Sequence, residues 1–114
     1  QVKQLQQNQQ NNLAESLPAV SSVELSDNNI VVLNQNVPNP FAQQTSISYT
    51  IPVSANSAQI LFYSMEGRLM KTANITTRGK GILNVFAGDL SNGSYTYSLM
   101  IDGKIADTKK LVKQ

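Results

Sequence analysis

The strongest constraint on the fold is a period-two alternation of apolar and polar side chains that begins near Asn29 and continues to the end of the chain. Successive side chains of a strand point to opposite faces, so this period indicates strands that each turn one face toward a core. In residues 45–51, for example, Ile47, Tyr49 and Ile51 share one face. The pattern predicts seven strands, over residues 30–33, 45–51, 58–64, 68–75, 82–86, 94–101 and 104–112.

Turn signals separate these segments. Met65-Glu66-Gly67 supplies a glycine for positive φ, Asn92-Gly93 lies in a loop, and Asp102-Gly103 is the strongest hairpin signal in the chain. The polar residues 76–81 contain two glycines and are predicted to form a loop. Short strands without intervening helical patterns predict an all-β domain of antiparallel sheets packed as a β-sandwich, with an open barrel as the alternative.

The first twelve residues are almost entirely Gln and Asn, with Val2 and Leu5 at a coiled-coil spacing that Gln9 and Asn12 do not continue. We interpret them as the end of a helical stem or, equally, as a disordered low-complexity linker. Residues 1–26 are therefore expected to be stem remnant and linker, and residues 27–114 the folded domain. Because the chain begins at Gln1 without an apolar leader, we expect a piece of a larger parent, dimeric or trimeric through the coiled coil.

Composition excludes the common catalytic centres. The chain has no His, Cys or Trp, so it lacks an imidazole base, a thiolate and a disulfide. The remaining acidic residues stand in turn positions, such as Glu66 before Gly67 and Asp102 before Gly103. A paired-carboxylate glycosidase is accordingly disfavoured, and we expect no enzyme and no cofactor.

Two short clusters have calcium-binding residue types: Asp27-Asn28-Asn29, and Asp89 with Asn92. Neither has the ligand number or spacing of a known calcium loop, so turn chemistry is the preferred interpretation and no metal is expected.

Charge is distributed unevenly. Residues 1–67 hold one basic and four acidic residues, whereas residues 68–114 hold eight basic and three acidic residues. The basic half either contacts an acidic partner or deters pairing between exposed strand edges. Its cations are scattered and lack an aromatic or arginine-rich motif, so nucleic acid is not expected as a partner. No apolar run is long enough for a transmembrane segment.

The seven aromatic rings favour a core. Tyr49, Tyr95 and Tyr97 fall on the apolar phase of their predicted strands, as do most of the others. If several rings faced solvent they would form a carbohydrate platform, which would favour an adhesive or carbohydrate-binding module that stays on the mature protein. This is the alternative to the function inferred below.

The segment Asn36-Val37-Pro38-Asn39-Pro40-Phe41 cannot belong to a strand. Its two prolines remove backbone donors and fix φ, so it is predicted to be a rigid, irregular lead-in that ends in an aromatic anchor.

Together with Glu66-Gly67-Arg68, Gly93-Ser94-Tyr95 and Lys109-Lys110-Leu111-Val112, this lead-in resembles the type A C-terminal sorting domain of the type IX secretion system. The resemblance runs from Val31 to the last residue. One motif departs from the family: Ser64-Met65-Glu66-Gly67-Arg68 lacks the usual aspartate.

The resemblance implies an Ig-like antiparallel β-sandwich of seven strands that acts as a non-catalytic address on a secreted cargo. Its implied partners are the outer-membrane translocon and a sortase-like signal peptidase. The implied route leads through the periplasm to secretion or attachment at the cell surface. The family motif positions, and hence the expected recognition residues, are Pro38, Asn39, Pro40, Phe41, Gly67, Arg68, Gly93, Tyr95, Lys109 and Lys110.

Two further expectations concern mechanism. The polar, unpatterned residues 21–29 suit cleavage by the peptidase. Recognition uses either a folded surface, with Lys109, Lys110 and Lys113 presenting charge, or pairing of the last strand with a partner sheet.

Overall fold

The structure, a computed structural model, describes residues 30–114. Within that range the chain is all β, as predicted, and it contains no helix that is long and apolar enough to cross a membrane. The expected stem, the expected boundary after residue 26, the expected cleavage segment and the Asp27 cluster lie outside the described residues.

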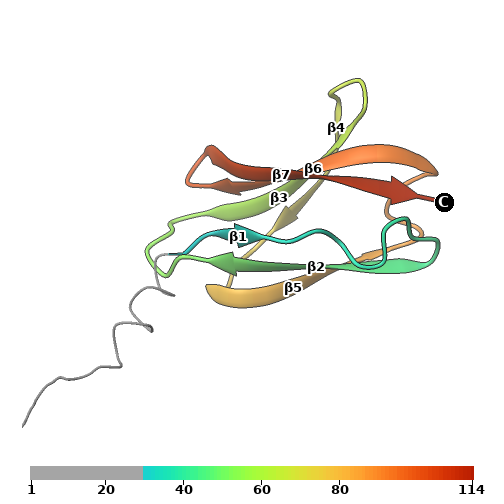
Figure 1. Ribbon diagram of the computed structural model, residues 1–114. Helices are drawn as coiled ribbons and strands as arrows, with labels where there is room; N and C mark the ends of the chain where they lie inside the picture. Colours follow the sequence, from blue (N-terminus) through green and yellow to red (C-terminus); the bar gives the residue numbers. More distant parts are fainter. Residues whose placement is uncertain (1–29) are drawn as a thin grey trace, which may run out of the picture.

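Seven strands form two antiparallel sheets that stack face to face (Figure 1). The three-stranded sheet has the order β1-β2-β5 and the four-stranded sheet the order β4-β3-β6-β7. The strands are β1 (Val32–Leu33), β2 (Gln44–Ile51), β3 (Ala58–Ser64), β4 (Leu69–Asn74), β5 (Gly79–Phe86), β6 (Gly93–Ile101) and β7 (Lys104–Lys113). The described chain starts at one end of this sandwich and the C-terminus lies at the other (Figure 1).

The inner faces of both sheets supply the core, because alternate side chains point inward. Ile47 of β2, Ile60 of β3 and Leu99 of β6 are fully buried. Tyr97 is also fully buried and lies 5.9 Å from Phe62 between ring centroids. Five of the seven rings are buried, so the expectation that they fill the core is confirmed, and Phe86 is the exposed exception.

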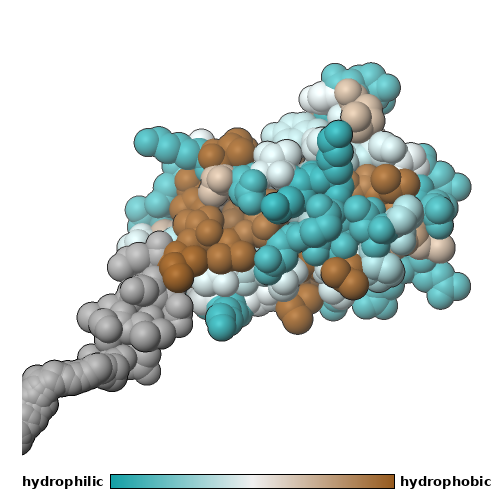
Figure 2. All heavy atoms as spheres, in the orientation of Figure 1, coloured by the Kyte–Doolittle hydropathy of each residue, from teal (hydrophilic) through white to brown (hydrophobic). Residues whose placement is uncertain are grey.

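Apolar side chains also remain at the end of the sandwich where the described chain begins. Ile30, Val31, Val53 and Ile105 are each between 39% and 58% exposed there. Figure 2 shows the apolar area beside the start of the chain, while hydrophilic side chains cover most of the rest of this view.

The predicted turns are confirmed at two places. Asp102 and Gly103 adopt φ of 51° and 81° and connect β6 to β7 in a tight hairpin. Gly67 has φ of 87°, and its N–H donates to the Ser64 carbonyl at 2.9 Å.

The prediction of a loop through residue 81 was wrong, because Gly79, Lys80 and Gly81 belong to β5. Gly81 pairs with Tyr49 of β2, and the Tyr49 ring lies where a Gly81 side chain would be: an added Cβ would come 2.5 Å from Tyr49 Oη. Local turn propensity was therefore overridden by a cross-strand packing requirement.

We predict that Gly81→Ala lowers the free energy of unfolding by about 1–3 kcal/mol, because the new methyl group overpacks the Tyr49 ring. Glycine-to-alanine exchange in an unobstructed strand would instead stabilise by roughly 0.5–1 kcal/mol. Urea denaturation measures the difference. Gly88→Ala is the matched control, since nothing lies within 4 Å of its added Cβ, and an equal response of both variants would contradict the prediction.

Candidate recognition surface at the C-terminal end

The residues expected to be recognised lie in two groups at one end of the sandwich. The proline-rich lead-in reaches Lys110 and Val112 of β7, while Arg68 of the β3–β4 hairpin lies near Gly93 and Tyr95 at the start of β6. Lys113 connects the groups: its Nζ donates to Asn92 Oδ1 at 3.0 Å and lies 6.0 Å above the Phe41 ring.

Residues 35–41, here called the clamp, bind the outer edge of β7 through backbone and side-chain hydrogen bonds. The Phe41 N–H donates to the Val112 carbonyl at 3.0 Å, and the Gln114 N–H donates to the Phe41 carbonyl at 2.8 Å. Asn39 Oδ1 accepts the Val112 N–H at 2.9 Å. The side-chain amides of Gln35 and Asn39 both donate to the Lys110 carbonyl. The expected rigid lead-in is therefore a cover for the last strand.

The clamp is held internally by two buried polar side chains that sequence reasoning missed. Asn36 Nδ2 donates to the Pro38 carbonyl at 3.1 Å and to Thr45 Oγ1 at 3.0 Å. Thr45 Oγ1 in turn donates to the Pro38 carbonyl at 2.7 Å. Both side chains are 1% exposed, and burial of polar groups requires such partners. The only sequence signal was an Asn two residues before the first proline.

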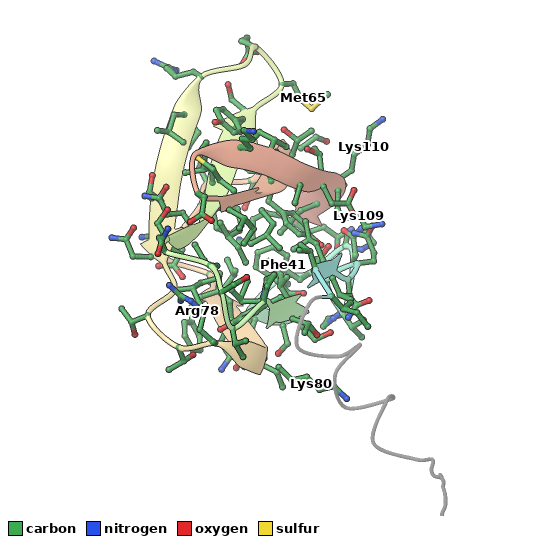
Figure 3. All side chains as sticks on the ribbon, turned by 90° about the vertical axis from the view of Figure 1, so that its left-hand side faces the viewer. Phe41, Met65, Arg78, Lys80, Lys109 and Lys110 are labelled. Atoms are coloured by element: carbon green, nitrogen blue, oxygen red, sulfur yellow. The ribbon has the colours of Figure 1, made fainter. Side chains whose placement is uncertain are left out.

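Phe41 anchors the clamp, as predicted. Its side chain is 1% exposed and lies in the middle of the molecule, whereas Lys110 and Met65 lie on the outside (Figure 3). The Val37–Pro38 and Asn39–Pro40 peptide bonds are cis.

The expectation that Lys113 presents charge to a partner was wrong. Lys113 is 8% exposed, because it points inward from the end of β7. Its ammonium donates to Asn92 Oδ1 and to the Gln114 carbonyl, so it ties the chain end to the loop before β6. Lys110 is exposed, and Lys109 is half-buried with its Nζ 3.7 Å from Asp107 Oδ2.

A groove of about 320 Å³ lies between the β3–β4 hairpin and residues 91–95, and we call it the hairpin groove. Met65 and Met70 line it and are 58% and 44% exposed. Arg68 and Glu66 supply one charge of each sign. Tyr95 is 5% exposed, and its hydroxyl donates to the Ser91 carbonyl at 2.7 Å, so it shapes the groove from below.

The contacts of Asp89 and Asn92 do not support a calcium site at this end. Asp89 and Asn92 do not converge on a common point: Asp89 binds the Phe86 N–H and Lys71, while Asn92 binds Lys113. The Phe86 hydrogen bond lowers the pKa of Asp89, with Lys71 acting in the same direction. Residues 30–114 contain no group of three His, Cys, Asp or Glu side chains that could hold a metal.

A second, open depression of about 770 Å³ lies on the outer face of the three-stranded sheet and is lined by Val32, Ser48, Thr50 and Lys80 among others. Tyr49 is the aromatic residue in its lining and is 9% exposed, so no aromatic platform for a sugar lies there.

We predict that Asn39→Ala loosens the end of β7, since it removes the acceptor of the Val112 N–H. The expected loss of unfolding free energy is about 1–2 kcal/mol, and the Val112 amide should exchange with solvent deuterium faster by about tenfold or more. Asn84→Ala is the control, because it removes one exposed hydrogen bond to Ser46 far along β5. Unchanged Val112 exchange in Asn39→Ala would contradict the clamp.

We also predict a stability loss at alkaline pH that depends on Tyr97. Burial raises the Tyr97 pKa from 10.0 to about 12, and its hydroxyl donates to the Asn34 carbonyl at 2.8 Å. Because the folded pKa is the higher one, the stabilisation is complete below pH 10 and is lost as pH rises from about 10 to about 12. Tyr97→Phe should lose about 1 kcal/mol at pH 8 but decline less steeply above pH 10. Unfolding free energies from urea denaturation, measured between pH 8 and pH 12, test the prediction. An equal decline with pH in the unchanged domain and in Tyr97→Phe would rule it out.

Comparison with protein families assigns the chain. The family model described as the secretion system C-terminal sorting domain matches residues 37–114. Searches of curated proteins and of solved structures return no match. The matched range contains all seven strands except β1 and includes every expected recognition residue. The chain therefore belongs to the family of C-terminal sorting domains of the type IX secretion system.

Proposed function

We propose that this domain is a non-catalytic signal that the type IX translocon reads as a folded object, and that the C-terminal end of the sandwich is the surface it reads. The observation that carries the proposal is the convergence of motif residues on one end. Asn39, Arg68 and Lys110 are distant in sequence. Asn39 is hydrogen-bonded to β7, and the hairpin of Arg68 is placed by the pairing of Ser64 with Tyr95.

Burial separates the motif residues into contact and support roles. Phe41 and Tyr95 are buried, so their function is to fix the clamp and the hairpin groove. Pro38, Asn39, Pro40, Gly67, Arg68, Gly93 and Lys110 are exposed, and Lys109 is half-buried. We assign direct contact with the translocon to the exposed charges, Arg68 and Lys110.

Docking of a folded surface is favoured over strand pairing by the end of β7. The clamp already occupies the outer backbone groups of Lys110, Val112 and Gln114. A partner strand could pair there only after displacing the clamp together with the Phe41 anchor, which would expose a ring that is now 1% accessible.

The acidic side chains support a non-catalytic role. Asp102 Oδ1 accepts the N–H groups of Asn56 and Ser57 at 2.7 and 2.9 Å, so it ties the β6–β7 turn to the loop before β3. Asp89 closes the loop after β5, and Asp107 binds the Thr108 N–H and Lys109. These three carboxylates are therefore used by turns and strands of the fold, and the turn positions of Asp89 and Asp102 were predicted from the sequence.

The remaining steps follow the family pattern. The signal directs export to the outer membrane or cell surface. We propose an Ig-like topology for the sandwich, transit through the periplasm, removal by a sortase-like peptidase within residues 21–29, and optional joining of the cargo to the cell surface. Cleavage there suits the geometry, since the described part of the chain begins at the end of the sandwich opposite the C-terminus and the proposed recognition surface (Figure 1). An oligomeric parent held by an upstream coiled coil also remains part of the proposal.

We predict that residues 21–114, fused to a periplasmic reporter in a host with the pathway, deliver it to the surface. Arg68→Glu and Lys110→Glu together should reduce delivery by about tenfold or more, because both charges of the contact surface are reversed.

Lys104→Glu alone is the matched control for Lys110→Glu alone: it reverses one charge on an exposed residue at the opposite end of β7. Equal delivery by these two single variants would contradict the assigned surface. A deletion of residues 109–114 is unsuitable, because it removes the fully buried Leu111 and the binding partners of the clamp.

A further inference from the structure

The outer edge of β5 is a long strand edge that the described residues leave unprotected. β7 is covered by the clamp at its end, over residues 110–114, and carries a register shift, β4 carries a register shift against β3, and β1 has two residues. β5, in contrast, pairs with β2 over eight residues in unbroken register and ends the three-stranded sheet. Natural sheets usually blunt such an edge with several charges, whereas this stretch carries one, Lys80, which deters a partner strand unless that strand neutralises it.

The hydrogen bonds of β2 identify which β5 groups are open. Ser46 and Ser48 of β2 bind Val37 and Asn34, on the side away from β5. The alternate β2 residues Thr45, Ile47 and Tyr49 therefore face β5. They pair with Val85, Leu83 and Gly81, whose N–H and C=O groups point to β2. Lys80, Ile82 and Asn84 consequently direct their backbone groups outward.

Asp89 marks where the open stretch ends. Its Oδ2 accepts the Phe86 N–H at 2.8 Å, and its own N–H donates to the Phe86 carbonyl at 2.9 Å. The outward groups of Phe86 are thus closed. Residues 80–84 form a bounded stretch with open donors and acceptors at every second residue.

The side chains of this edge fit a strand that brings one apolar and one acidic residue. Ile82 is 64% exposed on the outer face, where a neighbouring strand would cover it. Lys80 points away from the sandwich (Figure 3). Arg78, just before β5, donates to the carbonyls of Ala55 and Thr77, and the nearest carboxylate beyond β5, Asp89, is bound to Lys71.

This charge pattern distinguishes between occupants. A second copy of the chain would bring the same cations, Lys80 and Arg78, to a positive edge. A partner strand with an acidic side chain would neutralise Lys80 instead.

We propose that residues 80–84 of β5 add an extended strand from a protein of the secretion machinery, with an acidic side chain beside Lys80 and an apolar one beside Ile82. The inference rests on the proposed function, since it supplies a second contact for the same signal. Backbone pairing provides affinity and the two side chains provide selectivity.

Ile82→Pro tests the proposal on the reporter fusion. It removes an outward N–H and places a ring on the edge, while the hydrogen bonds to β2 belong to Gly81 and Leu83 and remain. We expect surface delivery to fall by about tenfold or more with little change in the urea midpoint. Ile82→Thr keeps the N–H and the branched shape and should stay within about threefold of the unchanged domain.

If Ile82→Pro lowers the urea midpoint, Ile82→Lys decides, because it adds a charge at an exposed position and should also reduce delivery. Normal delivery would overturn the proposal. It is judged with Ile82→Pro if that variant is as stable as the unchanged domain, and with Ile82→Lys if it is not. An Ile82-dependent dimer of the unchanged domain in sedimentation would assign the edge to a second copy and overturn it as well. If the unchanged fusion is not delivered, it is the proposed function that fails. The proposal for β5 fails only when the unchanged fusion is delivered and the Ile82 variants are delivered equally well.

Discussion

The segment of residues 37–41 is hydrogen-bonded to one sheet at its first residue and to the other sheet at its last. The rest of the structure depends on this bridge. Val37 pairs with Ser46 of β2 in the three-stranded sheet, and Phe41 pairs with Lys113 of β7 in the four-stranded sheet. The prolines between them fix the backbone that spans the gap. Because Phe41 also inserts its ring into the core, the same segment joins the layers through backbone contacts and through packing. The proposed recognition surface exists only where this bridge brings the clamp, β7 and the hairpin groove together.

The same bridge between the sheets also protects one of their exposed strand edges. The clamp closes the β7 edge over residues 110–114, so the end of the last strand is already occupied within the fold. Edge protection is uneven, since β5 has a regular register and an exposed Ile82. A signal that must stay soluble in transit and still be recognised is expected to protect most of its edges and leave few open.

Local patterns in the sequence predicted the strands but not the contacts between their ends. Alternation located β2, β3 and β6 nearly to the residue, and Asp102-Gly103 located a hairpin, since both signals act between near neighbours. The loop prediction for Gly79 and Gly81 failed because Tyr49, more than thirty residues away, needs the space of a missing side chain. The clamp was recognised as a motif, but its target on β7 lies more than seventy residues away, and Lys113 looked exposed because nothing local shows that Asn92 receives it.

The end of β7 is itself a structural element. The N–H of Gln114 donates to the Phe41 carbonyl, and Leu111, three residues earlier, is fully buried. During synthesis the domain therefore cannot complete its core until residues 111–114 have left the ribosome. A cargo truncated before these residues would lack a finished signal, so export is coupled to their translation by geometry alone.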